Sequence, residues 1–107
     1  MLIAAPLAMM LATAPSADAV GAGRKAFSAC LEAQIEPSLK TKPTLADFTA
    51  LLKAKCGDKE AAFRTAILAA DKADGMSLKD SQSDADDQVT EYVDKITAEY
   101  EDYAKSP

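Results

Sequence analysis

Two cysteines are the most reactive side chains in this 107-residue sequence. Cys30 and Cys56 do not form a C-x-x-C motif, and the chain has no histidine that could act as a base beside a nucleophilic thiol. In an oxidising compartment such a pair usually forms a disulfide. We therefore predict a structural Cys30–Cys56 bridge.

The lack of histidine also excludes a Ser-His-Asp triad, a Cys-His pair and a histidine-ligated zinc site. Pairs of carboxylates remain as candidate acid–base groups, but on a solvated helix face water keeps their pKa values near normal. We therefore predict that the protein is not an enzyme and that it uses no cofactor and no metal at a catalytic site.

Carboxylates dominate the end of the chain. From Asp80 to Pro107 there are nine acidic and two basic residues, a net charge of −7, whereas Val20 to Lys79 carries a net charge of +3. Such a stripe could face a cationic partner or bind a hard cation such as calcium, although the neighbouring sequence does not fit an EF-hand loop. The candidate partner or cation surface consists of Asp80, Asp84, Asp87, Glu91, Asp94 and Glu101.

A helix from Thr44 to Gly75 is expected to position Cys56. Pro43 disfavours a helix before it, Thr44 is a good N-cap, and Gly75 is a natural stop. Apolar residues recur along this stretch with the 3.6-residue period of one buried face. Gly57 leaves two alternatives open, one long helix or two shorter ones.

Two further helices are expected, from Arg24 to Glu36 and from about Leu78 to Ala104. Pro37 ends the first, Glu36–Thr44 connects it to the next helix, and Ser77 caps the last. Both cysteines lie on apolar faces, so an antiparallel pair of helices can bring them to the separation that a disulfide needs. The predicted fold is an all-α bundle of three helices, or of four if Gly57 breaks the second.

Residues 1–19 resemble a secretory signal. An apolar run of about thirteen residues precedes small residues at Ala17 and Ala19, as in an A-x-A cleavage site. The run is shorter than the roughly 20 residues of a membrane-spanning helix. We predict a mature single domain at 20–107, periplasmic or secreted, with no stable membrane span after cleavage.

The acidic net charge of −5 argues against a nucleic-acid partner. In composition and layout the mature chain resembles small exported two-cysteine helical bacterial proteins of unknown function. The stretch CGDKEAAFR, from Cys56 to Arg64, is also similar to the segment after the second cysteine of periplasmic acid-stress chaperones, with a one-residue gap and a shorter cysteine spacing. The sequence thus favours a non-enzymatic module that binds a protein partner. Acid-stress chaperone and cation-binding protein are the alternatives.

Overall fold

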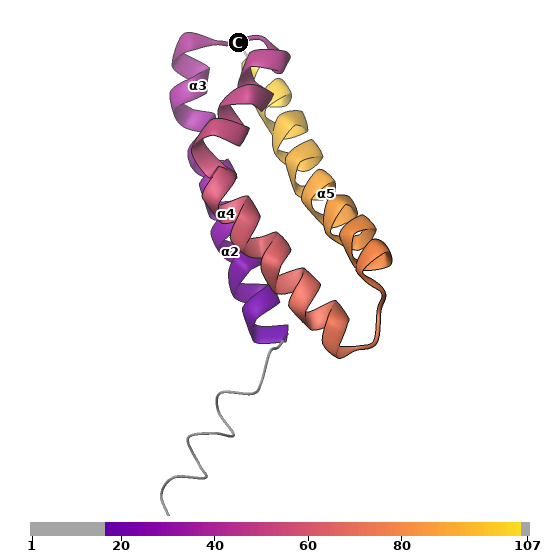
Figure 1. Cartoon of the computed structure of the whole chain (residues 1–107). Helices are drawn as coiled ribbons and strands as arrows, with labels where there is room; N and C mark the ends of the chain where they lie inside the picture. The colour runs from indigo at the N-terminus through magenta and orange to yellow at the C-terminus, as the bar shows by residue number, and fades with distance from the viewer. Residues whose placement is uncertain (1–16, 106–107) are drawn as a thin grey trace, which may run out of the picture.

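The computed structural model describes residues 17–105, and all of its regular structure is helical (Figure 1). The predicted all-α fold is confirmed as three long helices packed together, with one short helix between the first two. The elements are α2 (Ala17–Ala33), α3 (Ile35–Thr41), α4 (Leu45–Ala73) and α5 (Leu78–Lys105).

The central element is α4. It packs against α2 on one side and α5 on the other, whereas α2 and α5 contact each other much less. Figure 1 shows that the chain runs up through α2 and α3, down through α4 and up again through α5. The long helices are therefore antiparallel to their sequence neighbours, as short connections require.

The ends of α4 follow the predicted signals. The Thr44 hydroxyl accepts a hydrogen bond from the Asp47 amide at 3.1 Å, and Gly75 adopts a φ of 87° just after the helix. The helix runs unbroken through Gly57, so the single-helix alternative is correct. Mid-helix glycine costs about 1 kcal/mol, and the buried residues Cys56 and Phe63 on either side offset that cost.

The N-terminal half differs from its prediction. The first helix starts at Ala17 rather than Arg24 and ends at Ala33, and most of the expected connection folds as α3. Pro37 does not end a helix, because it sits in the first turn of α3, where a backbone N–H has no helical partner to lose. Lys42, in the left-handed conformation, then ends α3, and its backbone N–H donates a hydrogen bond to the Ser38 carbonyl at 2.7 Å.

The predicted signal sequence falls mainly on residues 1–16, which lie outside the described residues. The expected cleavage site after Ala19 falls within the first turn of α2, and Val20 packs against the core. Within residues 17–105, no helix has an apolar stretch that could cross a membrane.

The disulfide joins α2 to α4. Cys30 and Cys56 are bonded, with their Cα atoms 5.8 Å apart, which confirms the predicted pairing. Nearer the start of α2, Gly23 lies so close to α4 that a Cβ there would come within 3.1 Å of the Phe63 Cα. A covalent bond and a close helix crossing thus hold the same two helices together.

Aromatic side chains fill much of the core. Phe63 lies between Phe27, at 5.8 Å between ring centroids, and Tyr92, which meets it edge-on at 6.1 Å. The apolar face of α5 is buried along its middle, but Leu78 and Tyr103, near its two ends, are exposed at 66% and 54%.

Candidate binding surface on α4 and α5

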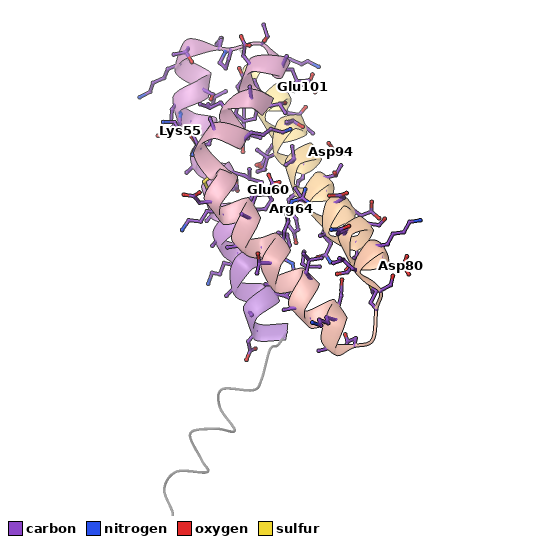
Figure 2. All side chains as sticks on the ribbon, viewed as in Figure 1. Lys55, Glu60, Arg64, Asp80, Asp94 and Glu101 are labelled. Atoms are coloured by element: carbon purple, nitrogen blue, oxygen red, sulfur yellow. A yellow bond between two sulfur atoms is a disulfide. The ribbon has the colours of Figure 1, made fainter. Side chains whose placement is uncertain are left out.

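Five of the six predicted acidic residues line the exposed side of α5. Figure 2 shows Asp80, Asp94 and Glu101 spread along the length of this helix. Within the part of the chain that the structure describes, none of the five has an ion-pair partner. They therefore present uncompensated negative charge to solvent; the five are Asp80, Asp87, Glu91, Asp94 and Glu101.

Asp84 is placed differently, because it is half-buried and interacts with α4. Its carboxylate accepts a hydrogen bond from Gln88 at 3.2 Å and lies beside the carboxyl group of Asp71. The buried Ser81 hydroxyl donates to Asp71 Oδ2 at 2.9 Å. Asp84 thus belongs to a contact between helices rather than to the open acidic surface.

The pKa of Asp71 is raised above its ordinary value. Burial is the main cause, followed by the hydrogen bond with Asp84 and by the negative charges of Asp84 and Asp74. The hydrogen bond from Ser81 acts in the opposite direction. The carboxyl group of Asp71 therefore favours its protonated form more than an ordinary aspartate does.

A hollow of about 180 Å³ opens between α4 and α5, on the other flank of α5 from Asp84. Its apolar lining comes from all three long helices, and polar groups surround it. The polar groups are Thr49, Lys53, Glu60 and Arg64 on α4, and Thr90 and Asp94 on α5. The apolar lining residues are Phe27, Leu31, Leu52, Val89 and Val93.

Arg64 bridges the two walls of the hollow. Its Nε lies 2.9 Å from Glu60 on α4 and its guanidinium also pairs with Asp86 on α5 at 2.5 Å. The bond with Asp86 is the main reason that the pKa of Arg64 is raised, and the bond with Glu60 adds to it. Figure 2 shows Glu60 and Arg64 in the space between the helices. The two carboxylates compensate the charge of Arg64.

A second hollow lies at the α4–α5 turn, where Met76 and Leu78 are exposed. Its lining carries one charged residue, Lys72, and no contact in residues 17–105 indicates what would cover it. No group of three or more acidic, cysteine or histidine side chains in the same residues could hold a metal ion. No assembled metal site in residues 17–105 therefore supports the cation-binding alternative.

Sequence reasoning did not find the α4–α5 hollow. Its lining comes from three helices, so helical periodicity in any one of them shows only which face is buried. Thr49 and Thr90 sit beside apolar stripes, but threonine at the edge of a stripe is common on any amphipathic helix. The lining residues come together only because α2 packs against α4 and α5.

The fold and this surface define a small disulfide-linked bundle of three long helices. Comparison of the chain with protein-family models, curated proteins and solved structures finds no match.

Proposed function

We propose that this protein is an exported, non-enzymatic binding module that holds a protein partner at the α4–α5 hollow. The observation that carries the proposal is the hollow itself, a recess of about 180 Å³ between α4 and α5 that reaches the buried core residues Phe27, Leu31 and Leu52. Concave sites with an apolar lining and a few polar groups at the edge are the usual form of binding sites.

The size of the hollow supports a side chain as its occupant. A cavity of about 150 Å³ lined by apolar residues can hold benzene, and this hollow measures about 180 Å³. It fits one bulky apolar side chain rather than a large cofactor. A protein that inserts one anchor residue and rests on the surrounding polar groups matches this shape.

The chemistry around the hollow supports binding rather than catalysis. The two carboxyl-bearing residues of the lining are Glu60, which is paired with Arg64, and Asp94, which is exposed. The thiols are consumed in the disulfide. The carboxylates of the lining are therefore one ion-paired group and one exposed group, which suits polar contacts with a partner.

Export is supported by the apolar run in residues 1–19 and by the disulfide, which is typical of oxidising compartments. N-terminal sequencing of the protein recovered from the periplasm or the culture medium should show that its first residue is Val20. Full-length protein with free thiols in the cytoplasm would contradict export.

The acid-stress alternative receives less support from the contacts between α4 and α5. Protonation would weaken the Arg64–Asp86 pair but would relieve the repulsion between Asp71 and Asp84. Acid therefore weakens the α4–α5 interface at the Arg64–Asp86 pair and strengthens it at the contact between Asp71 and Asp84. A uniform release of α5, by which acid would expose apolar faces of the bundle to a client protein, does not follow.

Site-specific photo-crosslinking in living cells tests the proposal. A diazirine amino acid would replace Thr90, at the edge of the hollow, and in a matched variant Thr65, exposed elsewhere on α4. We expect a defined protein adduct from position 90 and none from position 65. Equal labelling at both positions, or none at position 90, would refute a partner in the hollow.

A further inference from the structure

The two walls of the α4–α5 hollow differ in the charge they offer to a partner. On the α4 wall, Arg64 is compensated by Glu60 and Asp86, which leaves Lys53 as the cation of the lining without an ion pair in residues 17–105. On the α5 wall, Asp94 lies at the edge and is likewise unpaired. One side of the opening is therefore positive and the other negative.

The negative side extends well beyond the hollow. Asp87, Glu91 and Asp94 follow each other at steps of four and three residues, so they lie on one face of α5 over about 10 Å. All three are exposed and lack ion-pair partners among the described residues. The opening thus adjoins a row of carboxylates that begins at its own edge.

We infer that the partner binds through a basic segment, whose one bulky apolar or aromatic residue enters the hollow while its lysines or arginines lie over Asp87, Glu91 and Asp94. This inference rests on the proposed function, because it assigns the chemistry of the partner at the same site. Lys53 fixes the orientation, since it repels cationic residues placed on the α4 side of the anchor.

The two parts of this recognition have different signatures. Insertion of the anchor removes apolar surface from water and does not depend on salt. The contacts with the carboxylates are exposed, so each adds little alone and weakens as ionic strength rises. Loss of the anchor should therefore weaken binding at least 10-fold, and neutralising one carboxylate about 2- to 5-fold.

Defined peptides test the inference by NMR titration of the mature protein. The first probe is a twelve-residue, acetylated and amidated peptide of glycine and serine, with one central phenylalanine and four lysines. The second replaces the phenylalanine with alanine, and the third replaces the lysines with glutamates. We expect the first probe to shift the amide signals of Leu52, Thr90 and Val93 saturably, the second to bind at least 10-fold more weakly, and the third not to bind.

Variants of the protein separate the hollow from the acidic row. Thr90→Trp places a large ring at the edge of the hollow and should abolish the shifts, whereas the matched control Thr65→Trp should retain them. Asp87→Asn and Asp94→Asn should each weaken binding about 2- to 5-fold at 50 mM salt, and the difference should shrink at 300 mM.

Three results would overturn the inference. Equal binding of the lysine and glutamate probes would refute a basic partner but leave a binding site in the hollow. Shifts confined to the outer face of α5 would show that charge alone attracts the peptide. If no probe shifts the lining while position 90 still crosslinks to a partner in cells, the proposed function stands and the partner chemistry assigned here is wrong.

Discussion

Tyr100 stacks on Phe48 with ring centroids 4.1 Å apart and an angle of 13° between the rings. The same tyrosine donates a hydrogen bond from its hydroxyl to the Pro43 carbonyl at 2.7 Å. One residue near the end of α5 is therefore joined both to the first turns of α4 and to the connection that precedes it. This contact closes the end of the bundle that is opposite the α4–α5 turn.

Replacing Tyr100 separates these two contributions. Tyr100→Phe keeps the stacked ring and removes the hydrogen bond, so we expect a loss of about 1 kcal/mol in the free energy of unfolding. Tyr100→Ala also removes the buried ring and should cost about 3–5 kcal/mol. Urea denaturation measures both, with Tyr103→Phe, on an exposed tyrosine, as the control that should change little. A loss in Tyr100→Phe no larger than in this control would contradict the role of the hydroxyl.

The disulfide should supply a large part of the stability. It joins residues 26 positions apart, and closing a loop of that length should stabilise the fold by about 3.5 kcal/mol. We expect the Cys30→Ala/Cys56→Ala double variant to lose about that amount in chemical denaturation. Unfolded, non-reduced mature protein should show no free thiol on titration. Two reactive thiols would mean that the bridge does not form in the cell.

The pair formed by Asp71 and Asp84 should make stability depend on pH. Because folding raises the pKa of Asp71, this group stabilises the fold at low pH, and the contribution is lost as the pH rises through the raised pKa. Asp71→Asn keeps a hydrogen-bonding side chain and removes one of the two facing charges. We expect this variant to be more stable than the parent at pH 7, with a smaller difference at pH 4.

Denaturation midpoints between pH 4 and pH 8 check this expectation, and NMR titration of the Asp71 carboxyl carbon reports the pKa directly. Asp80→Asn is the matched control, since Asp80 is exposed and its side chain has no ion pair in the described residues. If the two variants respond to pH in the same way, the effect comes from net charge and not from the contact with Asp84.

Gly23 and Gly57 should respond in opposite ways to the same substitution. Both are inside helices, where alanine is favoured by about 1 kcal/mol. A Cβ at Gly57 meets nothing within 4 Å, so Gly57→Ala should stabilise the protein by about that amount. At Gly23 the new Cβ would lie 3.1 Å from the Phe63 Cα, and α2 must move away from α4. Thermal unfolding of the two variants compares them, and an equal gain in both would show that this helix crossing is not tight.

The sequence predicted those features that depend on neighbours along the chain. The caps at Thr44 and Ser77, the stop at Gly75 and the extent of α5 follow from local hydrogen bonding and from the period of the helix. The pairing of Cys30 with Cys56 was also predictable, because no other partner exists and both cysteines lie on apolar faces. The error at Pro37 was local too: a proline breaks a helix in its interior but is tolerated in its first turn, and sequence alone did not show where α3 begins.

Only the tertiary structure decided which residues form the candidate site. Asp84 shares the helical period of the acidic residues, yet α4 lies against its flank of α5 and draws it into contact with Asp71. The opposite flank of α5, with Thr90 and Asp94, instead opens onto the hollow whose lining includes Phe27 of α2. Periodicity determines which side of a helix is buried. The rotation and spacing of three packed helices determine which polar side chains at the edge of the buried side contact a neighbouring helix. They also determine which of these side chains stay free to contact a partner.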